Sequence, residues 1–252
     1  MIKGFYAAAS AMLSGMYRQE VLSHNVANID TPGFKQILTS MEDFMTTEAY
    51  TTPGVVGSPS LRHLGSLGLG VEMAEDTIDF TQGAMNATGN DLDVAIEGTG
   101  FFRIRTPEGE RYTRDGRMVR DAEGQLVTVD GFPYLSDNGQ PITIDQGIVS
   151  VSREGLISVN GEEAGSLGIA VFEDPGAVLT RTAGNYFESS AAPGTEDGGV
   201  VLQGYLESSN ANPTRLMTHM VEVLRSYQAA QQMVQNQDEL LGRSISVLGR
   251  IG

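Results

Sequence analysis

The sequence predicts an α+β protein whose N- and C-terminal helices pair as a coiled coil around a central antiparallel all-β domain. Three observations carry this prediction. Apolar residues near both ends recur at helical seam spacing, turn-forming dipeptides recur through the middle, and a stretch rich in Thr, Ser, Pro and Gly separates the first helix from the rest. We therefore expect four segments: an N-terminal helix and turn (1–41), an extended connector (42–71), a β-rich core domain (72–209) and a C-terminal helix (210–252).

The N-terminal segment has apolar residues at alternating steps of three and four positions, the spacing of a narrow helical seam. These residues are Ile2, Phe5, Ala9, Met12 and Met16. The helix should end before Pro32 and Gly33, which do not continue a helix. Because the apolar pattern runs on past any plausible cleavage point, we do not expect this segment to be a cleaved signal peptide.

Dipeptides that end in glycine recur about every eight residues through the middle of the chain. They are Glu108-Gly109, Asp115-Gly116, Glu123-Gly124, Asp130-Gly131, Asn138-Gly139, Gln146-Gly147, Glu154-Gly155 and Asn160-Gly161. Short β-prone runs such as 126–129, 142–144 and 148–151 lie between them. This pattern is typical of an antiparallel β unit. The stretch 46–70, in contrast, predicts a long extended connector.

The C-terminal helix is expected to begin at Asn212 and Pro213, since Asn caps free amides and Pro suits the first helical position. One seam line then recurs every seven residues: Met220, Tyr227, Val234, Leu241 and Leu248. Its partner line is Met217, Leu224, Gln231, Asp238 and Ile245. The two polar members, Gln231 and Asp238, weaken the centre of this seam.

The two apolar seams predict an assembly interface. Each occupies only about two positions in seven, whereas a helix that lies on a sheet usually has a broader apolar stripe. The alternative is that both helices pack on the β domain as ordinary core helices. The predicted interface comprises Ile2, Phe5, Ala9, Met12, Met16, Met217, Met220, Leu224, Tyr227, Val234, Leu241, Ile245 and Leu248.

The composition of the chain argues against most catalytic and ligand-binding functions. The net charge of −16 repels phosphate backbones and anionic lipids, so nucleic acid is not an expected partner. No run of 18 apolar residues is present, and no membrane insertion is expected. The chain has no cysteine, and its three histidines lack a second ligand at metal spacing. We therefore expect no catalytic, metal or cofactor site.

Several stretches resemble the bacterial flagellar rod and hook family. They are 23–35, with its Asn-rich helix end and Gly-Phe-Lys turn, 93–102, 112–116, and 204–212 followed by 225–228 inside the C-terminal helix. Their order and spacing agree with the family along essentially the whole chain. Pro32 stands where many members have Asn, and Ala211 stands where Val is usual. The motif residues of the turn are Asn25, Asn28, Thr31, Gly33, Phe34 and Lys35.

The resemblance implies a structural subunit of the flagellar basal-body rod, without enzymatic activity, located in the bacterial flagellum basal body. Such a subunit polymerises through its terminal helices into an axial shaft that transmits torque. Its partners would be further copies of itself, other rod and hook proteins, and the flagellar type III export apparatus. The stretch 42–71 favours the distal rod type, with the proximal type possible.

An alternative function is an extracellular adhesin or binding module with coiled-coil ends. It predicts an exposed aromatic binding patch and a membrane anchor or cleaved signal. The sequence contains no Trp and no recognisable anchor.

Overall fold

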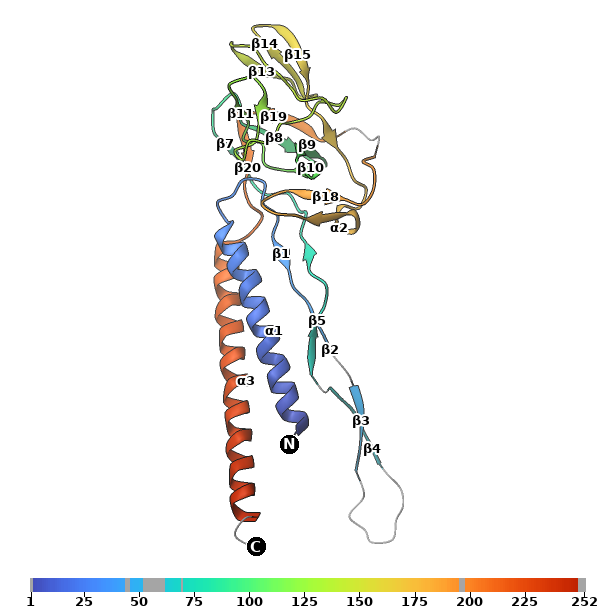
Figure 1. Ribbon diagram of the computed structural model, residues 1–252, viewed down its shortest axis with the longest axis vertical. Coiled ribbons are helices and arrows are strands. Elements are labelled where there is room, and N and C mark those ends of the chain that lie inside the picture. The colour runs from blue at the N-terminus through green and yellow to red at the C-terminus, as the bar shows by residue number, and fades with distance from the viewer. Residues whose placement is uncertain (1, 44–45, 52–61, 69, 195–197, 249–252) are drawn as a thin grey trace. The chain divides into compact units, whose positions relative to one another are not determined.

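The structure, a computed structural model, describes residues 2–43, 46–51, 62–68, 70–194 and 198–248 (Figure 1). The chain divides into two compact units. The first unit comprises Met1–Val26, Ile37–Thr77 and Pro213–Gly252, and the second comprises Ala27–Gln36 and Ile78–Asn212. Helices fall mainly in the first unit and antiparallel strands in the second, so the predicted α+β class is confirmed. The independence of a domain at 72–209 stays a prediction.

Two long helices form the body of the first unit. Helix α1 spans Ile2–Ala27 and helix α3 spans Pro213–Leu248, and they lie side by side (Figure 1). A Cβ atom added to Gly15 would lie 3.6 Å from the Cβ of Tyr227, and one added to Gly4 would meet the side chain of Gln237. The facing positions therefore run in opposite directions along the two helices. Small residues on α1 allow this close approach.

A narrow β arm completes the first unit. Its strands are β1 (Ile37–Leu38), β2 (Met41–Asp43), β3 (Thr46–Thr51), β4 (Arg62–Gly68), β5 (Val71–Met73) and β6 (Thr77–Ile78). Strand β2 pairs antiparallel with β5, and β3 with β4. The stretch predicted as a connector is extended but paired where it is described. Thr is enriched in β-strands, so this stretch can form a β ladder although its composition predicted an unpaired connector.

Hydrogen bonds attach the arm to α1 at three levels. The backbone N–H of Val71 donates to Ser10 Oγ at 3.2 Å, and the hydroxyl of Tyr17 donates to the carboxylate of Asp76. At the end of the helix, the side chain of Asn25 donates to the carbonyl of Ile37 at 2.8 Å and accepts from its N–H at 2.9 Å. The arm is thus part of the helical unit.

The second unit is built from short antiparallel strands and one short helix. The elements are β7 (Met85–Ala87), β8 (Val94–Glu97), β9 (Phe101–Thr106), β10 (Gly109–Thr113), β11 (Val119–Arg120), β12 (Leu126–Val127), β13 (Val149–Val151), β14 (Leu156–Val159), β15 (Glu162–Ser166), β16 (Ile169–Ala170), α2 (Pro175–Val178), β17 (Leu179–Arg181), β18 (Phe187–Ser189), β19 (Val200–Gln203) and β20 (Tyr205–Glu207). One sheet has the order β16-β9-β10-β18-β17 and another β13-β14-β15, and the pairs β8–β19, β7–β20 and β11–β12 accompany them. The registered strand pairs are antiparallel, as predicted.

Six of the eight glycine dipeptides lie at turns, as the sequence predicts, whereas Asp115-Gly116 and Gln146-Gly147 do not form turns. Six of their glycines have positive φ: Gly109, Gly124, Gly131, Gly139, Gly155 and Gly161. Glycine reaches this conformation without the steric cost that a Cβ atom would add. The regular spacing of these turns sets the short length of the strands.

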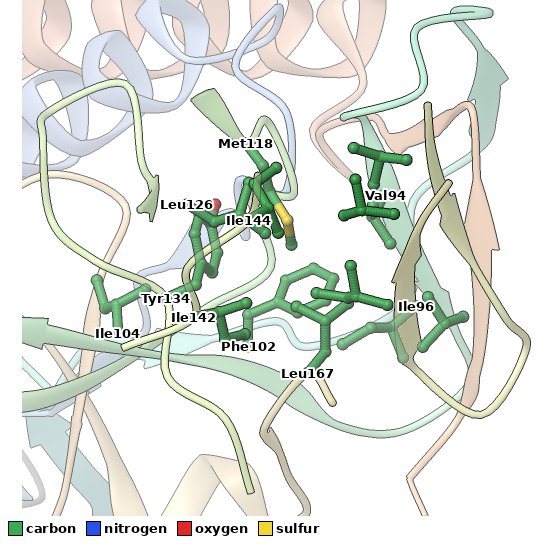
Figure 2. Close-up of a cluster of buried hydrophobic side chains, with 14 of the residues drawn as sticks. Val94, Ile96, Phe102, Ile104, Met118, Leu126, Tyr134, Ile142, Ile144 and Leu167 are labelled. Carbon is green, nitrogen blue, oxygen red and sulfur yellow. The ribbon is translucent and has the colours of Figure 1, made fainter. Parts of the chain in front are cut away.

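Strand β9 separates two apolar clusters, because successive side chains of a strand point to opposite faces. Phe102 lies in the larger cluster, with Val94, Ile96 and Leu126, which Figure 2 shows. The neighbouring Phe101 lies in the smaller cluster, where its ring centroid is 5.8 Å from that of Phe187. Each cluster brings together residues that lie far apart in the sequence. The two clusters together therefore stabilise the fold of the second unit.

Candidate assembly site

The predicted seam of α1 lies largely at the surface of the subunit. Met16 is 58% exposed, and Phe5 is also exposed. Ala9 and Met12 are half-buried, whereas Ala8 is buried. Ile2 belongs to the helix, but its side chain lies outside the described residues. Two of the four described seam residues are therefore exposed within one subunit, and the other two are half-buried.

On α3 the structure separates the two predicted lines. Met220, Tyr227 and Val234 are half-buried, and Leu241 is exposed. The side chain of Leu248 lies outside the described residues. On the partner line, Met217 is 59% exposed, Ile245 is 69% exposed and Leu224 is also exposed. The structure therefore does not bring the partner line into the interior of the subunit.

The sequence prediction missed Leu216 and Val223, which are the buried apolar residues of α3. Each lies one position before a residue of the predicted partner line. Leu216, Met220, Val223 and Tyr227 alternate steps of four and three, so they also satisfy the seam pattern. The sequence cannot decide which of two adjacent apolar lines faces inward. The result is that α3 buries one line and exposes the other.

The exposed line has an energetic consequence. Burial of a large apolar side chain against a partner contributes about 1.5–3 kcal/mol relative to leaving it in water. Met217, Leu224 and Ile245 on α3, with Phe5 and Met16 on α1, would therefore contribute free energy if a partner covered them. We call these five residues the terminal-helix face.

The motif turn lies in the second unit, where the segment 207–210 holds it. The N–H of Gly33 donates to the carbonyl of Glu207 at 2.7 Å. The N–H of Asn210 donates to the carbonyl of Phe34 at 3.3 Å, and its side-chain oxygen accepts from the N–H of Gln36 at 2.8 Å. The first sixth of the chain and its last fifth thus meet in one hydrogen-bonded junction.

Phe34 anchors the turn. Its side chain is buried, and the guanidinium of Arg181 lies 4.2 Å from the centre of its ring. Burial lowers the pKa of Arg181 to about 10. Asn185 adds a hydrogen bond to the carbonyl of Pro32 at 2.9 Å. An aromatic ring and a cation thus stabilise the turn together.

A buried ionic cluster, which we define as Lys35, Arg114 and Glu207, lies beside the turn. Lys35 Nζ is 2.6 Å from Glu207 Oε1, and Arg114 Nη1 is 3.2 Å from Glu207 Oε2. The side chains of Lys35 and Glu207 are each only 1% exposed. Burial lowers the pKa of Lys35, and Glu207 opposes that shift. Removing one partner from such a pair typically costs about 3–5 kcal/mol.

Sequence reasoning identified Lys35 but not its partners. Arg114 and Glu207 both lie within stretches that carry the family resemblance, and each is a charged residue beside a β-prone run. Their position beside these runs was the available signal for the two partners in the sequence. Pairing across 172 residues cannot be read from one sequence.

The remaining motif residues organise the end of α1. Thr31 donates its hydroxyl to Asn28 Oδ1 at 3.1 Å and its backbone N–H to the Asn28 carbonyl at 3.2 Å. Asn25 is buried and holds Ile37 within the first unit. These asparagines therefore terminate the helix and fix the direction of the chain that follows.

The described residues contain no group of three or more His, Asp or Glu side chains that could hold a metal ion. In the same part of the chain, no helix is long and apolar enough to cross a membrane. A hollow of about 490 Å³ lies beside Phe132 and Tyr186, where Tyr186 donates its hydroxyl to Asp130. Burial raises the pKa of Tyr186, so the phenol holds its proton tightly. This arrangement supports a packing role for Tyr186.

The exposed apolar side chains of the terminal helices and the buried junction of the β unit fit a structural protein. Comparisons with known proteins agree with this class. Residues 5–35 match the family described as flagella basal body rod protein, residues 95–159 the flagellar hook protein FlgE/F/G D1 domain, and residues 202–247 the flagellar basal body rod FlgEFG protein C-terminal region.

Relatives match along the whole chain. The flagellar basal-body rod protein FlgF of Caulobacter vibrioides is 34% identical over 257 residues, which cover all of both chains. FlgG of Borreliella burgdorferi is 33% identical over 96% of this chain and 97% of its own, and FlgG of Bacillus subtilis is 30% identical over 98% and 99%. The chain belongs to the flagellar basal-body rod protein family. It is a structural protein of the bacterial flagellum basal body and not an enzyme.

Proposed function

We propose that this chain polymerises through its terminal helices into the helical shaft of the rod, which transmits torque. The observation that carries the proposal is the exposed terminal-helix face. A contact that repeats head-to-tail without closing a ring generates an open helical filament. Many identical contacts then give a stiff shaft although each single contact is weak.

The helices would pair as a coiled coil in the assembled rod, and the β unit would face outward and add lateral contacts. The close approach of Gly15 to Tyr227 supports the pairing. The subunit would bind further copies of itself and the other rod and hook proteins. It would reach the tip of the rod unfolded, through the flagellar type III export apparatus.

Within the rod we favour the distal type. The pairing of β2 with β5 and of β3 with β4 supports this choice, since these strands lie in the stretch that favoured the distal type in the sequence. Relatives named FlgG, the distal type, and FlgF, the proximal type, match the chain at similar identity, so similarity alone does not separate the two. Family membership favours the rod over the adhesin alternative.

A matched pair of isoleucines tests the proposed interface. Ile245 on α3 is 69% exposed, and Ile148 in the second unit is 76% exposed. We expect Ile245→Asp to abolish polymers in electron micrographs and in sedimentation, because a charge would lie buried in the contact. Ile148→Asp is the control and should leave polymers intact. Normal polymerisation of Ile245→Asp, with both variants folded, would contradict the proposal.

A further inference from the structure

The buried ionic cluster joins parts of the chain that are far apart in sequence. Lys35 and Glu207 are separated by 172 residues, and Arg114 is 93 residues from Glu207. All three side chains are buried within the second unit. The cluster therefore exists only when three distant segments have come together.

The charges of the cluster are unequal. Glu207 is the carboxylate that both Lys35 and Arg114 contact. Asp79 adds a weaker attraction to Lys35, and Arg114 repels it. Without the Glu207 carboxylate, Lys35 would keep its hydrogen bond to the carbonyl of Thr81, and Arg114 would keep bonds to carbonyls alone. Two buried cations would then lack their carboxylate, an arrangement that strongly disfavours the closed state.

The backbone of the motif turn also bonds to the segment 207–210, which contains Glu207. Gly33 donates to the carbonyl of Glu207, while Phe34 and Gln36 bond to Asn210. Glu207 also accepts from the N–H of Gly83 at 2.9 Å. The segment 207–210 thus supplies three of the hydrogen bonds to the backbone of the turn, more than any other segment, while Asp79 and Asn185 add one each.

The larger apolar core does not have this dependence. Its buried members lie between Val94 and Val201, and strand β19, which closes on β8, ends at Gln203. The core therefore contains every segment it needs before Glu207 is reached. The placement of these residues allows the core to close before the turn docks.

We propose that the buried ionic cluster is a completion latch, which lets the turn 31–36 dock on the second unit only after the segment 204–210 has docked. A buried ion pair suits this task because an incomplete pair is penalised more severely than an incomplete apolar contact. A chain whose C-terminal part has not arrived keeps its turn undocked. The latch acts within one subunit and does not depend on the proposed polymerisation.

Hydrogen exchange on the full chain tests the latch. In Glu207→Gln, amides 33–36 should exchange on the order of 100-fold faster or more, because the two cations lose their carboxylate. Amides 102–105 in strand β9 should exchange as in the natural chain. Unchanged protection of 33–36 would overturn the latch. Equal loss in β9, or failure to fold, would also overturn it, since the cluster would then stabilise the unit as a whole.

A second variant tests whether the unequal charges of the buried ionic cluster cause the effect. Lys35→Met leaves Arg114 and Glu207 as a balanced pair, so protection of 33–36 should fall less than tenfold. A loss as large as that of Glu207→Gln would contradict the charge argument. Glu188→Gln is the control, because Glu188 is 51% exposed in its pair with Arg111, and Arg111 keeps a second carboxylate partner in Glu108. Glu188→Gln should leave the exchange of amides 33–36 and 102–105 unchanged. Faster exchange of amides 33–36 in this control would also count against the latch.

Discussion

Gly33 shows how one residue fixes the motif turn. Its φ of +67° is a conformation that L side chains rarely adopt, and a Cβ atom there would overlap the backbone of Arg114. The requirement is therefore double, because the residue needs both a left-handed backbone and no side chain. The sequence placed Gly33 in a turn, but the lack of room became visible only in the folded unit.

Gly89 supplies a matched control for this double requirement. It has a similar φ of +71°, but no atom of the described residues lies within 4 Å of an added Cβ atom. We expect Gly89→Ala to lower the free energy of unfolding by about 1–2 kcal/mol, the cost of the left-handed conformation. Gly33→Ala should lower it by about 2 kcal/mol more, because the backbone must also shift. Urea denaturation measures both, and equal losses would contradict the close approach.

Buried tyrosines give the fold an alkaline limit. Burial is the largest cause that raises the pKa of Tyr112, to about 12, and burial also raises the pKa of Tyr134. An unperturbed tyrosine titrates near pH 10. The folded state thus holds these protons more tightly than the unfolded chain does. The stability contributed by Tyr112 is full below about pH 10 and is lost as pH rises toward 12.

We therefore expect the free energy of unfolding to fall between about pH 10 and pH 12. Tyr112→Phe has no phenol to titrate at this position, so its stability should fall less steeply over the same range. Urea melts at several pH values between 8 and 12 measure the slope. Parallel curves for the natural chain and Tyr112→Phe would contradict the role of burial at this residue.

At the scale of elements, the sequence predicted both terminal helices and the turn-punctuated strands, because each leaves a periodic signal in neighbouring residues. It did not predict the paired β arm, because the sequence between the paired strands has little periodicity. It also did not identify Leu216 and Val223 as the inner line of α3, since an equally apolar line lies beside them. The close approach of Gly15 to Tyr227 is a further contact that no local pattern links.

The chain contains no cysteine, so an introduced pair can test the helix register without background. The 3.6 Å separation at Gly15 and Tyr227 falls within the Cβ–Cβ range of a disulfide. We expect Gly15→Cys with Tyr227→Cys to cross-link readily on mild oxidation. Gly15→Cys with Gln228→Cys is the control, because Gln228 is exposed on α3. Cross-linking that is equally fast in both pairs would show that the register is not fixed.

At the scale of the whole molecule, charge opposes association. Each subunit carries a net charge of −16. Screening shortens the reach of this repulsion from about 30 Å at 0.01 M salt to about 8 Å at 0.15 M. Assembly should therefore become faster as salt rises over this range. Light scattering measures the rate, and slower assembly with added salt would mean that attractive charge pairs dominate the contact.

Methionine oxidation tests the terminal-helix face most directly, because the rate follows the exposure of the thioether. Met16 and Met217 are exposed in the subunit, whereas Met118 is buried in the core of the second unit. In dispersed subunits, Met16 and Met217 should oxidise quickly and Met118 slowly. In polymers, Met16 and Met217 should become as protected as Met118, since they would be covered by neighbouring copies. Oxidation of Met16 and Met217 at the same rate in polymers and in dispersed subunits would contradict assembly through the terminal helices.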